Sequence, residues 1–404
     1  MKVLQINKYH YMRGGSERVF FNTIKLLRDH GHQVAPFATA HPKSLPSDFD
    51  KYFVDAPEIR DMGLIARIKA LPRFFWSNNA ARALDELLQD FKPDIAHIHN
   101  FFNGLSLSIL PVLRRHGVPV VMTLHDPRLV CPSPQWMLCG NKCLNCRKTL
   151  YTNCLRNRCC EGSLVLSAMG TMEMIHKDFL TRYDRCVDRY IFLNQAYRRL
   201  MSREHPEMME KGVVLPNFSP DLTMHRAERG DYFLFYGRLT EGKGVATFIK
   251  AAREVPEARF VVAGEGEMEK DLRDSALPNV QMRGFLSGQA LADTISGAQA
   301  ILVPSEWMDN NPMTIIEAYS YGKPVIASDI GGIPDMIIEG RTGHIVSPKA
   351  PDELAAAIRR VGALGDADYA AMSNEARRFA LDNFNSDVYY SRLMEIYRQA
   401  RSNY

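Results

Sequence analysis

A glycine-rich loop with two basic residues carries the strongest chemical signal in the sequence. Residues 237–244 read Gly-Arg-Leu-Thr-Glu-Gly-Lys-Gly and lie between a strand-like apolar run and a helical pattern. Such a loop turns backbone N–H groups and a helix N-terminus toward an anion, and Arg238 and Lys243 add two positive charges. The pattern predicts a pyrophosphate site, or else a plain loop whose basic side chains are solvated. Gly264-Glu265, after the next strand pattern, could let a nucleotide approach the backbone, but such a glycine pair by itself fits a plain turn better.

A second segment places carboxylates around a predicted helix start. Asp309 precedes Asn310, Asn311 and a proline, which are typical of a first helical turn, and Glu317 lies about one and a half turns further on. The N–H groups of that turn can bind a phosphate, and the two carboxylates can accept hydrogen bonds from the hydroxyl groups of a sugar and a ribose. The alternative is a helix-capping acid with a solvated glutamate.

The N-terminal half offers a second glycine loop and a histidine. Gly14-Gly15 precedes a helical pattern and is another candidate anion site. His125 follows the apolar run at 118–124, at the expected ligand-facing end of a strand, where it could donate to a sugar hydroxyl or shuttle a proton. His97 and His99 alternate on a strand, point to one face, and are expected to be packing histidines of the core.

Seven of the eight cysteines fall between residues 131 and 160. In a long chain without a secretory signal, such clustering indicates a metal site or a local structural knot rather than a disulfide framework. Cys143-x-x-Cys146 has metal-ligand spacing, and a four-thiolate zinc site would need two more cysteines. Buried free thiols are the main alternative, and an iron–sulfur cluster is a third.

The elements that must position these residues alternate between strand and helix. Such alternation predicts parallel sheets covered by helices on both faces, with ligands beyond the carboxyl ends of the strands. Because a single core rarely exceeds ~250–300 residues, the 404-residue chain is expected to form two doubly wound α/β domains facing a cleft. We place the first domain at 1–218, with the cysteine insert at 131–160, the second at 219–385, and a final helix at 386–404 that returns toward the first.

Composition excludes several classes of protein. The chain is 46% apolar and 24% charged, as globular proteins are, and it contains no signal-peptide core and no apolar run long enough to span a membrane. A cytoplasmic protein, at most peripheral on the inner face of a membrane, is therefore expected. Residues 1–220 carry a formal charge of +10 and residues 221–404 one of −6, so the first half favours an anionic partner. The stretch 60–76 interleaves basic with apolar and aromatic residues, as a helix resting on anionic lipid would, or as a core element would.

Taken together, the motifs resemble family 4 of the retaining glycosyltransferases, which has the two-Rossmann architecture called GT-B. The resemblance covers nearly the whole chain, and the ordered set of motifs is far more specific than any one of them. They are G-G-S-E-R-V near the start, L-H-D-P at 124–127, G-R-L-T-E-G-K-G at 237–244, V-A-G-E-G-E at 262–267 and the stretch ending I-I-E-A-Y-S-Y-G-K-P-V-I-A-S-D-I-G-G.

The resemblance implies a role for each candidate residue. Arg238 and Lys243 would clamp the donor pyrophosphate, Glu317 would hold the ribose hydroxyls, and Gly264 and Glu265 would lie along the nucleotide. Asp309, with the amides of Asn310 and Asn311, would grip the transferred sugar; the family usually has glutamate at the position of Asp309. Gly15 would meet the diphosphate from the other domain, and His125 would contact the donor sugar near its anomeric carbon. A subgroup with H-D-x-R-L-x-C-P followed by C-x-x-C and R-C selects four cysteines for a structural zinc: Cys131, Cys143, Cys146 and Cys159.

The implied reaction is transfer of a sugar from a nucleotide diphosphate sugar to a hydroxyl of a saccharide acceptor, with a polyprenyl-diphosphate-linked acceptor and surface polysaccharide as the expected context. No D-x-D tripeptide stands at a strand end to hold a catalytic metal, so no cofactor is expected for catalysis. Two alternatives are a nucleotide-sugar 2-epimerase of the same fold and a zinc-dependent nucleic-acid-binding protein. The cysteine segment lacks the paired knuckles and recognition helix of the latter, and we expect no nucleic-acid partner.

Overall fold

The computed structural model describes residues 1–56, 75–102, 104–133, 136–138, 141–146, 151–203, 205–220, 222 and 228–402. The chain forms two compact units. The first comprises Met1–Leu138, Cys143–Leu215 and Tyr389–Tyr404, and the second comprises Cys139–Lys142 and Pro216–Val388. Most of the basic and aromatic stretch at 60–76, namely residues 60–74, lies outside the described residues, as does Cys139.

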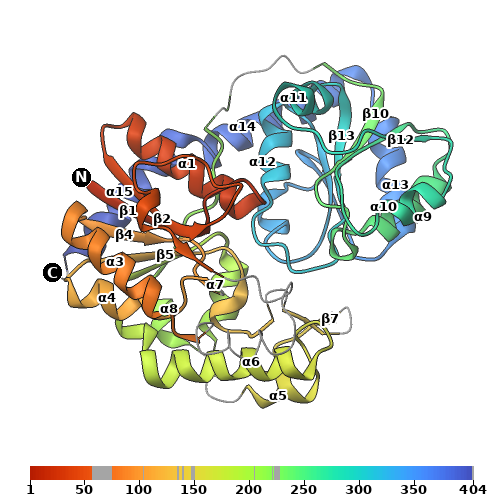
Figure 1. Ribbon diagram of the computed structural model, residues 1–404. Coiled ribbons are helices and arrows are strands. Elements are labelled where there is room, and N and C mark those ends of the chain that lie inside the picture. Colours follow the sequence, from red (N-terminus) through yellow and green to blue (C-terminus); the bar gives the residue numbers. More distant parts are fainter. Residues whose placement is uncertain are drawn as a thin grey trace. The chain divides into compact units, whose positions relative to one another are not determined.

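The first unit is built on a seven-stranded sheet in which every recorded strand pair is parallel (Figure 1). Its apolar runs are buried, as expected for strands covered on both faces. In sheet order the strands are β3 (Val54–Asp55), β2 (Gln33–Ala40), β1 (Lys2–Tyr9), β4 (Ile95–Ile98), β5 (Val120–Leu124), β8 (Arg189–Phe192) and β9 (Gly212–Val214). The strand order reverses between β1 and β4, and ligands of such sheets bind at the carboxyl ends around that point.

The helices of the first unit follow the predicted alternation. Helix α4 begins only at Ile109, because the preceding residues form a turn with Ser106 at φ +63°. The helices are α1 (Gly15–Asp29), α3 (Asn78–Phe91), α4 (Ile109–Arg115), α5 (Thr152–Arg156), α6 (Leu164–Ile175), α7 (Gln195–Ser202) and α8 (Pro206–Lys211). A two-stranded ribbon of β6 (Met137–Leu138) and β7 (Asn141–Lys142) lies in the cysteine segment.

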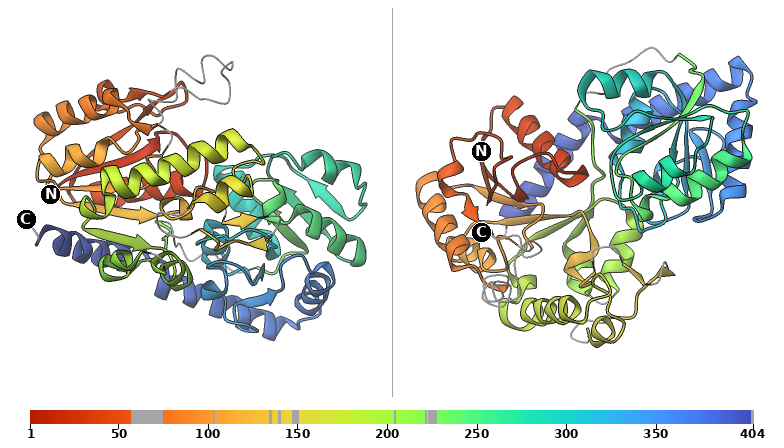
Figure 2. Two further views of the ribbon diagram at one scale, coloured as in Figure 1. Left: turned by 90° about the horizontal axis from the view of Figure 1, so that it is seen from below. Right: turned by 45° about the vertical axis from the view of Figure 1, so that its right-hand side comes forward.

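The second unit has a six-stranded, fully parallel sheet with the strand order of a dinucleotide-binding fold. Helices cover both faces, α9, α10 and α13 on one side and α12 and α14 on the other (Figures 1 and 2). The strands in sheet order are β12 (Val280–Met282), β11 (Phe260–Ala263), β10 (Tyr232–Tyr236), β13 (Ala298–Val303), β14 (Val325–Ser328) and β15 (Gly343–Val346). The helices are α9 (Val245–Glu254), α10 (Glu269–Asp274), α11 (Gly288–Ser296), α12 (Met313–Ser320), α13 (Pro351–Gly362) and α14 (Asp366–Asn383).

The last helix, α15 (Ser386–Arg401), packs its C-terminal part into the first unit. The hydroxyl of Tyr397 lies 3.2 Å from Nε2 of Gln5 on β1, and that of Tyr390 lies 2.8 Å from Nε2 of His32. The first unit is therefore completed by residues from the opposite end of the chain. Among the described helices, none is both long enough and apolar enough to cross a bilayer.

Candidate functional site

The candidate donor residues of the second unit stand on the two central strands of its sheet. The loop containing Arg238 and Lys243 follows β10, and the segment containing Asp309 follows β13. β10 and β13 are hydrogen-bonded neighbours, and the strand order reverses between them. The structure thus brings the two strongest sequence motifs to the point where a doubly wound sheet offers its ligand site.

Lys243 and Asp309 form an ion pair at this point. Nζ of Lys243 lies 2.6 Å from Oδ2 of Asp309, and the Ser305 hydroxyl donates to the same oxygen at 2.7 Å. Burial by itself would raise the pKa of Asp309, but the Lys243 charge and hydrogen bonds from Lys243, Ser305 and Trp307 outweigh it and hold that pKa below its ordinary value. Asp309 is therefore a carboxylate at neutral pH, and it compensates the Lys243 charge when no anion is bound.

The indole ring of Trp307 lies beside the two basic residues, a role that no sequence motif predicts. The guanidinium carbon of Arg238 lies 5.5 Å from the centroid of the indole ring, and Nζ of Lys243 lies 5.3 Å from it. A Cβ on Gly242 would come within 2.5 Å of the ring, so only glycine lets the loop lie this close. The indole ring thereby positions the guanidinium group of Arg238 and the ammonium group of Lys243.

Gly264 lets the loops after β10 and β11 meet backbone to backbone. Its φ is +154°, and a Cβ there would stand 1.8 Å from the carbonyl oxygen of Gly237. Beyond it, the carbonyl of the exposed Glu265 accepts from the N–H of Leu239 at 2.9 Å. This glycine is needed for packing between loops, a different reason from the predicted approach of a nucleotide.

Glu317 is half-buried on α12 and faces the end of β10. The Tyr236 hydroxyl lies 3.1 Å from Oε2 of Glu317 and 3.1 Å from the carbonyl oxygen of Thr314. Tyr236, which sequence reasoning missed, therefore orients the carboxylate predicted to hold ribose hydroxyls.

The two asparagines before α12 are buried, and the helix begins at Met313 rather than at the asparagines. The side chain of Asn311 accepts from the N–H of Asn217 at 2.8 Å, and its carbonyl accepts from the Asn217 amide at 2.9 Å. The Asn311 side chain therefore anchors the segment that enters the second unit. Asn310 is equally buried beside it.

In the first unit, Gly14 and Gly15 stand at the start of α1, directly after β1. Gly14 occupies the N-cap position and Gly15 is the first helical residue. Glu17 is buried in the same turn and accepts from the Ser16 hydroxyl at 3.1 Å. A carboxylate already occupies this helix start, which places a negative charge next to the predicted anion loop.

His125 belongs to a chain of hydrogen bonds that crosses the first sheet and is mostly buried. Nε2 of His125 lies 2.9 Å from Nδ1 of His99, whose Nε2 lies 3.0 Å from Oε1 of Gln5. Nε2 of Gln5 donates to the Tyr397 hydroxyl, which lies 2.8 Å from Nδ1 of His97. Nε2 of His97 in turn lies 2.7 Å from the hydroxyl of Thr123. Both predicted packing histidines are buried, and they are part of this network rather than inert filling.

Burial keeps His125 neutral, and the network determines its tautomer. Burial lowers the pKa of His97 to about 3 and that of His125 to about 4, and it lowers the pKa of His99 well below its ordinary value, so all three are neutral at pH 7. With Oε1 of Gln5 as acceptor, Nε2 of His99 must donate and its Nδ1 must accept from Nε2–H of His125. Nδ1 of His125 is then an acceptor, suited to a sugar hydroxyl rather than to donating a proton.

The four cysteines selected for a metal line one small cavity of about 30 Å³, together with Cys154, Trp136 and His205. Burial raises the pKa of Cys131 and of Cys146, the latter to about 11, and neighbouring thiols raise both further. Cys154 also contacts Cys160, with their sulfur atoms 3.9 Å from each other. Within the ranges described, no three histidine, cysteine, aspartate or glutamate side chains already stand as ligands of one ion.

Comparison with known proteins gives matches along most of the chain. Residues 13–218 match the family described as Glycosyltransferase Family 4, and residues 224–379 match Glycosyl transferases group 1. The first curated relatives are matched over 35% to 62% of their own length. Phosphatidyl-myo-inositol mannosyltransferase of Mycobacterium tuberculosis is 24% identical, with 98% of this chain and 96% of that protein covered.

Solved structures resemble the chain over its full length. Sucrose-phosphate synthase of Thermosynechococcus elongatus superposes with a TM-score of 0.74 at 18% identity, covering 100% of both chains. HepE of Anabaena, solved with UDP-glucose, gives a TM-score of 0.63 at 17% identity and covers 98% of both. These likenesses confirm the predicted α/β fold with two Rossmann-like domains.

Proposed function

Because the chain belongs to glycosyltransferase family 4, we propose that it moves a sugar from a nucleotide diphosphate sugar to a hydroxyl of a saccharide acceptor. The transfer would retain the configuration at the anomeric carbon. The observation that carries the proposal is the cluster of Arg238, Lys243, Asp309 and Glu317 around the ends of β10 and β13. It combines cations for a diphosphate with carboxylates for hydroxyl groups. HepE, whose structure contains UDP-glucose, supports a nucleotide sugar as donor.

The cations would act on the leaving group. As the bond from the anomeric carbon to the diphosphate breaks, negative charge grows on the phosphate oxygens, and Arg238, Lys243 and the start of α9 would stabilise it. Lys243 lies against Asp309 in the free protein, so binding of the diphosphate would compete for this lysine. Asp309 would then be free to accept from a hydroxyl of the sugar, beside Asn310 and Asn311.

Glu317, oriented by Tyr236, would accept from the two ribose hydroxyls. By the resemblance, Gly15 would meet the diphosphate and His125 would contact the sugar, with its Nδ1 accepting a hydrogen bond from a hydroxyl group. Because no carboxylate is an evident nucleophile, departure and attack on the same face of the sugar would account for retention. The leaving phosphate would then take the proton of the acceptor hydroxyl.

The acceptor would be a polyprenyl-diphosphate-linked saccharide at an anionic membrane surface, used in the synthesis of a surface polysaccharide. The formal charge of +10 on residues 1–220 supports an anionic acceptor. The name of the mycobacterial relative, phosphatidyl-myo-inositol mannosyltransferase, indicates a lipid acceptor for that protein.

We also propose a structural zinc ion held by Cys131, Cys143, Cys146 and Cys159. All four line one cavity, and four thiolates are a usual ligand set for zinc. Burial raises the pKa of Cys131, Cys146 and Cys159, and a bound dication would offset the cost of ionising these thiols. The ion would order the segment and would take no part in sugar transfer.

Glu317→Ala and Arg238→Ala test the donor site. We expect both variants to stay folded, to lose stabilisation by nucleoside diphosphates in a thermal-shift screen, and to lose transfer activity. Glu254→Ala and Arg253→Ala, exposed on α9, are the matched controls and should behave as the parent. Retained diphosphate binding in both site variants, or unfolding with full activity per folded molecule, would refute the assignment.

A further inference from the structure

Helix α6 and the π-helical turn that continues it, η4 (His176–Thr181), have their polar and apolar faces reversed. The sides turned into the unit include three charged residues, Glu173, Lys177 and Asp178, all buried. The side turned outward is apolar. Of the thirteen large hydrophobic side chains exposed in the described residues, six lie in this stretch: Leu164, Val165, Met172, Ile175, Phe179 and Leu180.

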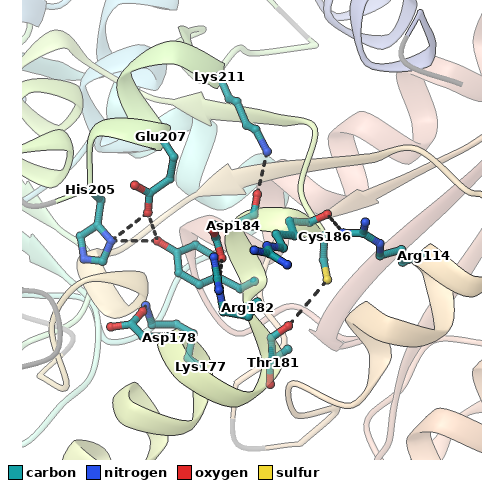
Figure 3. A network of polar contacts seen from close by, with 12 residues as sticks. Arg114, Lys177, Asp178, Thr181, Arg182, Asp184, Cys186, His205, Glu207 and Lys211 are labelled. Atoms are coloured by element: carbon teal, nitrogen blue, oxygen red, sulfur yellow. Dashed lines mark hydrogen bonds and ion pairs between the residues drawn. The ribbon is translucent and has the colours of Figure 1, made fainter.

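The buried charges hold the helix in this orientation. Lys177 pairs with Asp178, and its ammonium lies 4.0 Å from the centroid of the Tyr183 ring. The Tyr151 hydroxyl donates to Asp178 at 2.7 Å. Figure 3 shows Lys177 and Asp178 inside the polar network that also contains His205 and Glu207. Turning the apolar side inward would strip these charges of their partners, so the helix is locked with its apolar face outward.

The exposed side chains form one continuous stripe. Val165, Met172 and Phe179 are seven residues apart, and Ile175 lies between the last two, which places all four on one helical face. The stripe extends over roughly 20 Å at 1.5 Å per residue. Trp76 adjoins it, with its ring 5.7 Å from that of His176. An exposed apolar surface of this extent marks an interaction site rather than ordinary surface.

Arginines surround the C-terminal end of the stripe. Leu180 also lines a hollow of about 560 Å³ together with four arginines: Arg114, Arg115, Arg182 and Arg185. Arg115 is bound to Asp85 at 2.5 Å, and Arg182 lies 3.5 Å from Asp184. Arg114 donates to the carbonyl of Arg185, which is a neutral partner. In the part of the chain that the structure describes, these ion pairs set two carboxylates against the four guanidinium groups, so this end of the stripe is positive beside apolar side chains.

We propose that the face formed by α6, η4 and the four arginines rests on the surface of an anionic lipid bilayer. The apolar stripe would enter the boundary between headgroups and acyl chains, and the arginines would meet the phosphates. A basic rim favours anionic lipid over a second copy of the chain, because two such rims would repel each other. The inference gives the membrane part of the proposed function a specific surface, and it does not depend on the donor chemistry.

Sedimentation with vesicles tests this surface. The full chain is mixed with phosphatidylcholine vesicles, with or without phosphatidylglycerol, at ~0.1 M and ~1 M salt, where the Debye length falls from ~10 Å to ~3 Å. We expect binding only to the anionic vesicles, and at least about tenfold weaker binding at high salt. Phe179→Ser with Leu180→Ser should weaken binding by about tenfold or more, because two large side chains no longer leave water.

Matched controls separate this surface from others. Phe285→Ser removes a side chain that is 68% exposed in the second unit and should leave binding unchanged. Arg182→Glu should weaken binding several-fold, whereas Arg253→Glu on α9 should not. The melting temperature and the stabilisation by UDP of each variant show whether folding and the donor site are intact.

Three results would overturn the inference. The first is a parent protein that stays in the supernatant at low salt. The second is equal binding by the parent and the Phe179→Ser, Leu180→Ser variant. The third is a parent dimer in analytical ultracentrifugation that this variant dissociates, because the stripe would then be a contact between copies. Failure of the donor site alone, seen as loss of UDP stabilisation in the parent, would leave the vesicle result standing.

Discussion

The Tyr397 hydroxyl offers a direct test of the buried network. Tyr397→Phe removes one oxygen and leaves the ring in place, so the packing of α15 is conserved. Two buried groups lose their partner, Nε2 of Gln5 and Nδ1 of His97. A buried polar group without a partner costs ~1–3 kcal/mol, so for two groups we expect the free energy of unfolding to fall by about 2–6 kcal/mol. At ~2–4 °C per kcal/mol for a unit of this size, the melting temperature should fall by roughly 4–24 °C.

The matched control lies on the same helix. Tyr390→Phe also removes a hydroxyl that contacts a histidine, Nε2 of His32 at 2.8 Å, but Tyr390 is only half-buried. Water can replace this partner, so the loss should stay below about 1 kcal/mol. Differential scanning calorimetry of the parent and both variants measures the difference. Equal melting temperatures for the two variants would refute the reasoning that the network is dry and fully satisfied.

The same variant should also change a distant histidine. Without the Tyr397 hydroxyl, nothing holds the Gln5 amide in one orientation, and the donor–acceptor order that reaches His125 through His99 is no longer fixed. Nitrogen NMR of histidine-labelled protein distinguishes the two neutral tautomers. The His125 signals should move toward a mixture of tautomers, while those of His116, which is bound to Asp85, should not. A His125 spectrum identical to the parent's would show that its tautomer is set elsewhere.

Three further predictions concern pH, loop packing and metal. The folded-state pKa values of His97 and His99 lie below the unfolded value of ~6.5, so their contribution to folding stability is fully present above that pH and is lost as the pH falls. Below pH ~6.5 each histidine should lower the free energy of unfolding by up to ~1.4 kcal/mol per pH unit. A urea midpoint that is unchanged from pH 7 to pH 5 would contradict this prediction. Gly264→Ala should destabilise the second unit by about 2 kcal/mol or more in urea denaturation. The control Gly284→Ala also lies at positive φ, but its Cβ would meet open space, so it should cost less. Equal losses of stability would exclude the loop contact as the cause. Elemental analysis of protein purified without added metal should find about one zinc ion per chain, and absence of zinc with all eight thiols titratable would reduce the cysteine segment to packing.

The alternation of apolar runs and helical patterns was enough to predict both sheets. A buried parallel strand such as β14 (Val325–Ser328) needs a short continuous apolar run, which can be recognised in the sequence. β15 (Gly343–Val346) was not predicted, since a glycine and a histidine interrupt its apolar pattern. The loops after β10 and β13 could be predicted as a site because parallel strands bring their carboxyl ends to one edge.

What the sequence could not show depends on distant partners. His97 looked like a packing residue because its partner, Tyr397, is 300 positions away. The pattern of α6 predicted a helix, but periodicity does not say which face is buried. Here the buried Lys177–Asp178 pair decides it, against the usual rule that apolar residues face inward.

The return of α15 to the first unit has a consequence for biosynthesis. The ribosome makes Gln5 and His97 within the first hundred residues, but their buried partner Tyr397 emerges only after the whole of Pro216–Val388. Domains generally fold as units during synthesis, N-terminal first. In this chain, the second unit can complete its core while the first still exposes an unfilled groove and unsatisfied polar groups. A stop codon just before α15 would therefore leave the first unit, which is synthesised earliest, without the helix that completes it.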